Sequence, residues 1–268
     1  MKTGKPVFEK GYTYVAGILN LTPDSFSDGG KYEEEGALNI VERMIAEGAD
    51  MIDIGAESTR PGALAVDAAE EKRRLIPVIE AIRKSYDIYI SVDTYKPQVA
   101  DAALSAGADM INDISGLGYG GTGMLRAAFK HKAPIIMMYN KDYHGLPEKK
   151  EELVEYIKDV LSGCADKAAA EGLSRDRIII DPGIGFAGGT ENDLTILRNL
   201  DDICSLGYKV MLGCSRKSVI GNSLDLPVDQ REEATIVTSI LGAQAGCAIV
   251  RVHNVLSNRR ALDMLAVI

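Results

Sequence analysis

Eight short apolar runs recur along the chain, and a stretch with helical periodicity separates each run from the next. This regular alternation favours an α/β fold in which the apolar runs are strands. Because the runs are apolar on both faces, they are typical of a parallel sheet that helices cover. The expected strands are Tyr14–Leu19, Met51–Ile54, Ile88–Val92, Met110–Ile114, Ile135–Tyr139, Ile178–Ile180, Val210–Leu212 and Ala248–Val252.

The intervening stretches repeat apolar residues at three- and four-residue spacing, which indicates amphipathic helices. A glycine stands between a helical stretch and the following strand at Gly48, Gly107, Gly172, Gly207 and Gly246. Glycine is common just after a helix because it adopts the left-handed backbone conformation at little cost. The clearest expected helices are Ala37–Ala46, Ala69–Lys84, Pro97–Ala106, Glu151–Ala170, Leu194–Leu206 and Glu232–Ala245.

Eight strands and about eight helices in 268 residues fit one closed (β/α)8 barrel, or TIM barrel, over residues 1–268. No linker or low-complexity tract divides the chain into two domains. An open doubly wound sheet is the alternative, but no GxGxxG turn follows the first expected strand. In a barrel of this type the active site lies at the carboxyl ends of the strands.

The formal net charge of −9 argues against a general nucleic-acid or anionic-membrane binder, because both functions need a basic face. The first ten residues are charged without an apolar run, so we expect no secretory signal. Apolar runs elsewhere are too short to span a membrane. The cysteines (Cys164, Cys204, Cys214 and Cys247) form no CxxC pair. We therefore expect thiols in a cytoplasmic protein rather than a zinc site.

Basic side chains gather after the last two expected strands, at Arg216, Lys217, Arg251 and His253. This corner of an α/β barrel often holds phosphate. An arginine fork and a mobile lysine both suit phosphate oxygens, so the cluster indicates an anion site. The alternative is a network of ion pairs on the rim of the barrel.

Acid and amide side chains end three other strands, at Asp93, Asn112 and Asp181. Unpaired polar groups are costly in a partly dry barrel mouth. A flat, amino-substituted heterocycle would satisfy them, because a carboxylate accepts two parallel N–H bonds from such a ring edge. The alternative is that these groups pair with nearby backbone or lysine and stabilise the barrel.

Two segments rich in Gly, Pro, Ser and Asp follow the first two expected strands, at residues 22–30 and 58–62. Long loops of this composition over a barrel mouth favour a lid that excludes water. Phe26 and Asp28 lie in the first of them. We expect Phe26 to cover a ligand, although packing on a neighbouring helix is the alternative.

Seven segments in order along nearly the whole chain resemble the dihydropteroate synthase family. The first, GILNLTPDSFSDGG, and the second, DIGAESTRPG, resemble the two family signatures. The segments are Gly17–Gly30, Asp53–Gly62, Ser91–Thr94, Ile111–Gly116, Asp181–Phe186, Ser215–Ser218 and Arg251–His253.

The resemblance implies a transferase of folate biosynthesis that uses Mg²⁺ as a cofactor. Such an enzyme joins 6-hydroxymethyl-7,8-dihydropterin diphosphate to para-aminobenzoate, yields 7,8-dihydropteroate and releases diphosphate. It also implies a homodimer formed through barrel helices away from the mouth, and competition of sulfonamides with para-aminobenzoate.

The resemblance also implies a role for each matching residue. The pterin site would comprise Asp93, Asn112, Met138, Asp181 and Lys217. The diphosphate site would comprise Asn20, Arg251 and His253, with Asn20 also a ligand of Mg²⁺. The para-aminobenzoate site would comprise Phe26, Thr59, Arg60, Pro61, Phe186 and Ser218. The catalytic groups would be Asp28, Lys217, Arg251 and His253. From the place of Asp28 in the first loop we hypothesise that it stabilises the pterin cation and orients the amine.

The chain departs from the family pattern after the fifth and sixth expected strands. Tyr139 replaces a usual histidine, and Ala187 follows Phe186 where a Gly-Lys pair is usual. Two other functions stay open. A pterin-binding methyltransferase would share the acid and amide cluster, but it would not need the segments around Arg60 and Lys217. A non-catalytic relative that only binds pterin or stabilises a partner would not need Arg60, Lys217 and Arg251 intact.

Overall fold

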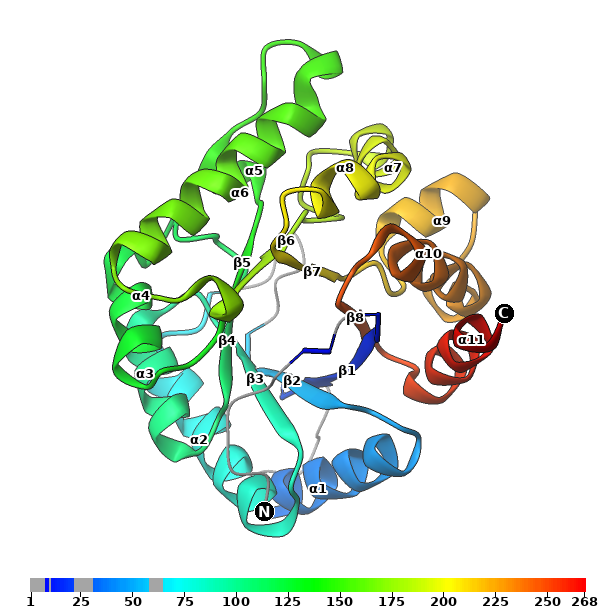
Figure 1. Cartoon of the computed structure of the whole chain (residues 1–268). Helices are drawn as coiled ribbons and strands as arrows, with labels where there is room; N and C mark the ends of the chain where they lie inside the picture. The colour runs from blue at the N-terminus through cyan, green and yellow to red at the C-terminus, as the bar shows by residue number, and fades with distance from the viewer. Residues whose placement is uncertain (1–7, 10, 22–30, 58–64) are drawn as a thin grey trace.

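A computed structural model describes residues 8–9, 11–21, 31–57 and 65–268 of the chain. Eight parallel strands follow one another around a closed barrel in chain order, and β1 pairs with β8 to close it (Figure 1). The (β/α)8 barrel expected from the alternation is therefore confirmed. The strands are β1 (Tyr14–Asn20), β2 (Met51–Gly55), β3 (Tyr89–Asp93), β4 (Met110–Asp113), β5 (Ile135–Met138), β6 (Ile178–Asp181), β7 (Lys209–Leu212) and β8 (Ile249–Val252).

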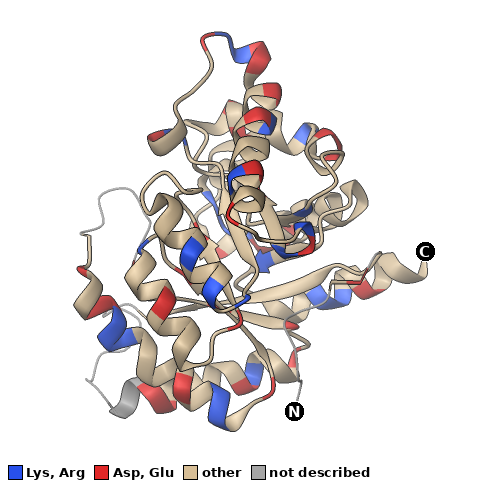
Figure 2. Ribbon diagram, turned by 60° about the vertical axis from the view of Figure 1, so that its left-hand side comes forward, with Lys and Arg blue, Asp and Glu red and all other residues tan. Residues whose placement is uncertain are grey.

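Helices surround the barrel on its outside, and their outer faces carry interspersed acidic and basic residues (Figures 1 and 2). Their inner faces pack on the outward-pointing side chains of the strands, such as the fully buried Ile52, Ile90 and Ile111. The helices are α1 (Lys31–Ala46), α2 (Ala68–Ser85), α3 (Pro97–Ala106), α4 (Gly121–Lys130), α5 (Lys141–His144), α6 (Leu153–Ala170), α7 (Thr190–Arg198), α8 (Leu200–Cys204), α9 (Ser218–Leu224), α10 (Glu232–Ala245) and α11 (Val255–Val267).

One expected helix, Leu194–Leu206, is wrong as a single element, because the structure has α7 and α8 in its place. The helix is interrupted at Asn199, whose φ of −124° and ψ of 32° lie outside the helical region. The Asn199 side chain donates to the carbonyl of Thr195 at 2.7 Å. Amides that bond nearby backbone in this way compete with helical hydrogen bonds, which explains the break.

The helix ends expected at glycine have the predicted geometry. Gly107 ends α3 with φ of 116°, and Gly246 ends α10 with φ of 99°. Both donate their backbone N–H to carbonyls of the last helical turn. Since other residues are strained in this conformation, these glycines fix where the chain turns back into the barrel. Among the helices that the structure describes, none is both long and apolar enough to cross a membrane.

The amino-terminal half of the barrel interior is filled by apolar side chains that point inward. Together they form a cluster separate from the layer between strands and helices, and we call it the interior plug. The plug fills the barrel at the level below the carboxyl ends of the strands, and its only side-chain polar group is the hydroxyl of Tyr14. The plug consists of Tyr14, Ala16, Met51, Met110, Ile136, Ile179, Met211 and Ile249.

Candidate active site

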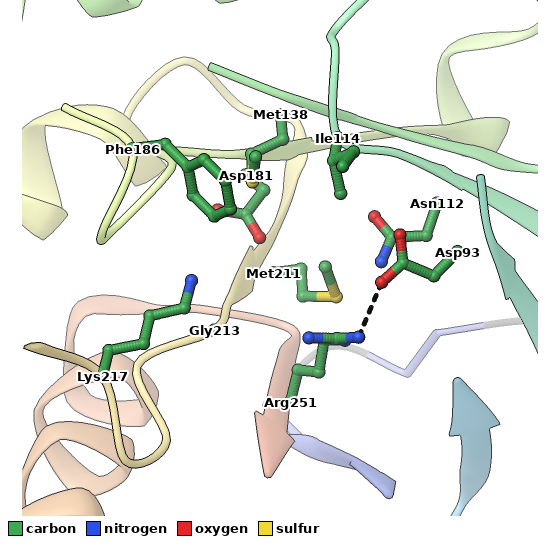
Figure 3. A pocket seen from close by; sticks show the side chains of 10 residues that line it. All are labelled: Asp93, Asn112, Ile114, Met138, Asp181, Phe186, Met211, Gly213, Lys217 and Arg251. Carbon is green, nitrogen blue, oxygen red and sulfur yellow. Dashed lines mark hydrogen bonds and ion pairs between the residues drawn. The ribbon is translucent and has the colours of Figure 1, made fainter. Parts of the chain in front are cut away.

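A pocket opens at the carboxyl ends of the strands, directly above the interior plug. Polar groups line it on several sides, and two methionines and a phenylalanine supply apolar surface (Figure 3). Such a mixture of apolar walls and a few convergent polar groups is typical of a small-molecule site. The lining residues are Asp93, Asn112, Ile114, Met138, Asp181, Phe186, Met211, Gly213, Lys217 and Arg251.

The strand alternation explains why these side chains face one another. Side chains two residues apart on a strand point to the same face, so each residue two positions after a plug residue also points inward. Asp93 also points inward, because it stands four residues after Tyr89, which packs against the plug. On the strands after β1, the residues that stand two positions after plug residues are Asp53, Asn112, Met138, Asp181, Gly213 and Arg251.

One wall of the pocket is an ion-pair network centred on Arg251. Its Nε donates to Oδ2 of Asp53 at 2.5 Å, and its Nη2 donates to Oδ2 of Asp93 at 2.8 Å. Asn112 Nδ2 also donates to Oδ2 of Asp53, at 3.2 Å. Three neighbouring strands and β8 thus hold one guanidinium against two carboxylates at the edge of the pocket.

Asp181 and Lys217 lie on the opposite wall (Figure 3), and the charge of the lysine attracts that of the carboxylate. Oδ1 of Asp181 accepts the backbone N–H of Gly183 at 2.8 Å, which fixes the carboxylate. Lys217 Nζ donates to the carbonyl of Ile184 at 2.5 Å and lies 5.0 Å from the centre of the Phe186 ring. The ammonium therefore lies between a carboxylate and an aromatic face inside the pocket.

Burial changes the charge balance of the pocket. It raises the pKa of Asp93 to about 7, against the attraction of Arg251 and with the repulsion of Asp53. It also raises the pKa of Asp181, against the attraction of Lys217, and lowers the pKa of Lys217. Ionised groups that lose water without full compensation in this way are a common mark of functional sites.

Unmet hydrogen-bonding capacity lies under the pocket. Within the part of the chain that the structure describes, Oδ1 of Asp53, Oγ of Ser91 and Oδ1 of Asn112 are buried without a hydrogen-bond partner. Asp53 and Ser91 are register partners on β2 and β3, and Asn112 follows on β4. Leaving such atoms unpaired lowers stability, which indicates that this wall was not shaped for stability alone.

The pocket brings together seven of the residues singled out in the sequence. They come from β3, β4, β5, β6, β8 and the segments after β6 and β7. All of the residues expected at the pterin line it, together with Arg251 and Phe186: Asp93, Asn112, Met138, Asp181, Phe186, Lys217 and Arg251.

Three other candidates lie outside the lining. Asn20 is exposed at the end of β1, and Ser218 is exposed at the start of α9. His253 follows β8, where its Nδ1 lies 2.9 Å from Oγ of Ser215 and its backbone N–H donates to the same oxygen at 3.2 Å. The remaining candidates, Phe26, Asp28, Thr59, Arg60 and Pro61, lie outside the described residues.

The expected basic corner is only partly correct. Arg216 does not line the pocket, and its Nη2 lies 3.5 Å from Oε2 of Glu232 on α10. Arg251 contacts the carboxylates of Asp53 and Asp93 instead of forming one basic cluster with Lys217. The two clusters that the sequence separated into acid and basic sides are therefore interleaved, because burial of several charges requires each to have an opposite neighbour.

The sequence analysis gives no role to Asp53, although the structure places its carboxylate against Arg251. Its signal was available, since it is an acidic residue within an apolar run on the inward register of Met51. Ile114, Met211 and Gly213 were also missed. They carry no polar group, and only the closed barrel shows that they face the same space.

Comparison with known proteins agrees with this geometry. The model of the pterin binding enzyme family matches residues 16–253. The chain is 45% identical over 271 aligned residues to the dihydropteroate synthase of Clostridium beijerinckii, covering 100% of this chain and 99% of that relative.

Solved structures of dihydropteroate synthases are similar to this chain in both fold and sequence. The dihydropteroate synthase of Clostridium difficile in the presence of pteroic acid matches with a TM-score of 0.90 and 42% identity, covering 96% of this chain and 97% of that one. The Xanthomonas albilineans enzyme with 4-aminobenzoic acid matches with a TM-score of 0.88 and 38% identity, covering 95% and 92%. The chain therefore belongs to the pterin binding enzyme family and, within it, to the dihydropteroate synthases.

Proposed function

We propose that the pocket binds 6-hydroxymethyl-7,8-dihydropterin diphosphate and that the chain, a cytoplasmic transferase, joins it to para-aminobenzoate. The exocyclic C–O bond to diphosphate breaks, a C–N bond to the arylamine forms, and the nitrogen loses a proton. One observation carries the proposal above all. A single pocket places the carboxyl and amide groups of Asp93, Asn112 and Asp181 around the same space as Lys217 and Arg251.

The pterin ring suits the polar pattern of the pocket. Asp181 can accept two parallel N–H bonds from the amidine-like edge of the ring, because Gly183 already holds its carboxylate in place. Asn112 supplies both a donor and an acceptor, and its Oδ1 has no partner among the described residues. Met138, which is 3% exposed, offers an apolar surface to the ring face. Lys217 donates to a ring acceptor.

The diphosphate would lie at the outer side of Arg251, towards Asn20 and His253. Arg251 donates from Nε to Asp53 and from Nη2 to Asp93, and its guanidinium carries further N–H donors. His253 would donate from the ring nitrogen that does not face Ser215. These donors stabilise the negative charge that grows on the leaving group, so they act mainly on the rate of C–O cleavage.

The residues present fit a magnesium ion that is held largely by the substrate. The described residues contain no group of three His, Cys, Asp or Glu side chains that could hold a metal. Mg²⁺ prefers oxygen ligands and usually binds through one or two protein groups plus phosphates. The exposed amide of Asn20 at the end of β1 offers one such oxygen. When bound, Mg²⁺ would neutralise the departing diphosphate.

The second substrate would bind beyond Lys217, at the exposed start of α9. Ser218 lies there, and Phe186 borders the pocket beside Lys217. Phe26, Thr59, Arg60 and Pro61 complete the proposed aminobenzoate site. The X. albilineans relative was solved with 4-aminobenzoic acid, which supports this substrate class. We also expect sulfonamides to compete with para-aminobenzoate in a titration of the initial rate.

Asp28 is proposed to stabilise the pterin cation and to orient the attacking amine. The arylamine needs little general-base help because its pKa is low, so a nearby carboxylate would act mainly through its charge. Unchanged turnover in an Asp28→Ala enzyme would remove this role.

The decisive experiment supplies the pterin diphosphate, Mg²⁺ and para-aminobenzoate, and follows diphosphate release and dihydropteroate formation together. We expect both products in equal amounts, and loss of both when EDTA removes the metal. A folded protein that binds pterin and forms no product would favour the non-catalytic alternative. Methyl transfer from a reduced folate to a corrinoid protein would favour the methyltransferase alternative.

A homodimer is proposed through the outer faces of α10 and α11, away from the pocket. These neighbouring helices expose large apolar side chains, with Val237 at 56%, Leu241 at 46% and Met264 at 58% exposure. Exposed apolar side chains gathered on neighbouring helices are typical of an interface. Light scattering should give twice the chain mass for the native protein, and Val237→Glu should lower it to that of one chain.

A further inference from the structure

The segment between β7 and α9 contains a strained residue directly before the pocket lysine. Arg216 has φ of 57°, in the left-handed region that residues other than glycine rarely adopt. The next residue, Lys217, extends its side chain into the pocket to Ile184. Strained residues persist only where surrounding contacts determine their conformation, and they gather at functional sites.

The residue before α10 and the first turn of that helix supply those contacts. Arg231 Nη1 donates to the carbonyl of Arg216 at 3.0 Å and to that of Lys217 at 3.4 Å. Its Nε donates to the carbonyl of Leu226 at 2.9 Å, which anchors the same guanidinium beyond α9. Thr235 Oγ accepts the backbone N–H of Arg216 at 3.1 Å. We call Arg231 and Thr235 the α10 clamp.

The clamp therefore holds both backbone polar groups of the strained residue. Thr235 is fully buried, and its hydroxyl donates to the carbonyl of Arg231 at 2.8 Å, which leaves its lone pairs for the N–H of Arg216. One guanidinium bonds the carbonyls of both Arg216 and Lys217. It therefore fixes the peptide groups on both sides of the Lys217 Cα, and with them the direction of the lysine side chain.

A second, independent feature shows that the space is shaped around Arg231. Gly221 on α9 has no side chain, and a Cβ built there would lie 2.0 Å from Nη2 of Arg231. The guanidinium thus occupies a place that any larger residue at this position would fill. A glycine inside a helix lowers helix stability, so its presence here favours the placement of the guanidinium.

We infer that Arg231 and Thr235 are positioning residues that hold Arg216 in its left-handed conformation and thereby direct Lys217 into the pterin pocket. Neither residue lines the pocket. Without the clamp the turn would relax, and Lys217 would lose its alignment with Asp181 and with the Ile184 carbonyl. The inference rests on the proposed function only where it concerns pterin affinity.

The first test measures the affinity for 6-hydroxymethylpterin by calorimetry. Arg231→Met keeps an unbranched apolar stem but removes the guanidinium and its donors, and Thr235→Val keeps the shape but removes the hydroxyl. We expect each to weaken binding about 10- to 100-fold, because small misplacement of a binding group has effects of this size. Thr235→Ser retains the hydroxyl and should bind as the native protein does.

Arg259→Met is the matched control. Arg259 on α11 also donates to a backbone carbonyl, that of Thr13 at 3.2 Å, but it does so at the amino-terminal end of the barrel. Its loss should lower the thermal midpoint without changing pterin affinity. Equal affinity in native protein, Arg231→Met and Thr235→Val, with all folded, would overturn the inference.

The second test does not depend on any pterin. Limited acetylation with acetic anhydride, read residue by residue by mass spectrometry, gives the labelling rate of Lys217 against pH. Burial lowers the pKa of Lys217, while Asp181, Asp193 and Cys214 oppose this effect and Arg251 adds to it. A lysine that leaves the pocket regains its ordinary pKa, so the midpoint of labelling should move to higher pH in Arg231→Met.

The two tests separate the possible failures. If native protein does not bind pterin but the Lys217 midpoint moves in Arg231→Met and not in Arg259→Met, the proposed function fails and the clamp stands. If native protein binds pterin and the midpoint stays the same in all variants, the clamp is overturned while the proposed function stands.

Discussion

Two levels of the same barrel interior differ in what fills them. The interior plug at the amino-terminal level is apolar, and Met110, Ile136 and Ile179 within it are fully buried. The pocket level, further along the same strands, holds the charged groups of buried Asp181 and of the largely buried Asp93 and Arg251. The backbone is continuous between the levels, so the difference lies only in the side chains.

This difference separates the part of the barrel that stabilises from the part that acts. Apolar burial in the plug contributes roughly 25 cal/mol per Å² and needs no partner of defined geometry. Buried charges and the unpaired oxygen atoms of Asp53 and Asn112 lower stability instead. Changes in the plug should therefore alter stability with little effect on catalysis, and changes in the pocket should do the reverse.

The largest expected effect is that of Asp181→Asn in the pocket. The amide keeps the shape and can still accept the N–H of Gly183, but it loses the charge that faces Lys217 and the pterin edge. We expect kcat/KM for the pterin diphosphate to fall about 1,000-fold. The thermal midpoint should stay the same or rise. A variant that unfolds instead would break the proposed division between the two levels.

The corresponding change in the plug is Ile136→Ala. It leaves a cavity among closely packed side chains and should lower the free energy of unfolding by about 3 kcal/mol in a urea titration. The KM values for the pterin diphosphate and for para-aminobenzoate should remain as in the native protein. Ile136→Val is the graded control and should lower stability by only about 1 kcal/mol. A large change in KM would mean that the plug also shapes the pocket.

A smaller effect concerns pH. Burial raises the pKa of Asp93 from 3.8 to about 7, so between these values the folded protein binds a proton that the unfolded chain has released. Stability contributed by this group is therefore lost as pH rises from about 4 to about 7. Asp93→Asn should make the slope of unfolding free energy against pH less negative, by at most about 1.4 kcal/mol per pH unit. Identical slopes in the two proteins would refute the raised pKa.

The smallest expected effect is that of removing an exposed ion pair on the outer helices. Lys130 on α4 pairs with Asp101 on α3 at 2.8 Å, but both side chains are exposed. Lys130→Ala should change the free energy of unfolding by less than about 1 kcal/mol, because exposed ion pairs contribute little. Activity should be unchanged. A larger loss would show that charge outside the barrel matters as much as charge inside it.

Much of the site followed from the sequence because strand ends are few and their register is regular. Asp93, Asn112 and Asp181 stand at the ends of apolar runs, and the parallel order of the strands brings such ends to one rim. The chain did not reveal that Arg251 crosses to Asp53 and Asp93, or that Arg216 turns away to Glu232. Those partners depend on side-chain directions that neighbouring elements set.

The helix break at Asn199 shows the same limit on a smaller scale. Periodicity over the range Leu194–Leu206 is helical throughout, and only the backbone bonds of Asn199 and its neighbours divide it. The role inferred for Arg231 is likewise invisible in the chain, because it lies 14 residues after Lys217 and acts through backbone carbonyls.

The sequence by itself determined the alternation of strands and helices, the order of the strands around the barrel and the rim to which the polar residues belong. It did so because inward and outward faces follow from a period of two residues, which a chain carries locally. Only the tertiary structure decided which charges meet, which are displaced, and which residue holds Lys217 in place. Those outcomes depend on the balance between burial and pairing of charges from distant segments, and that balance exists only after the barrel has closed.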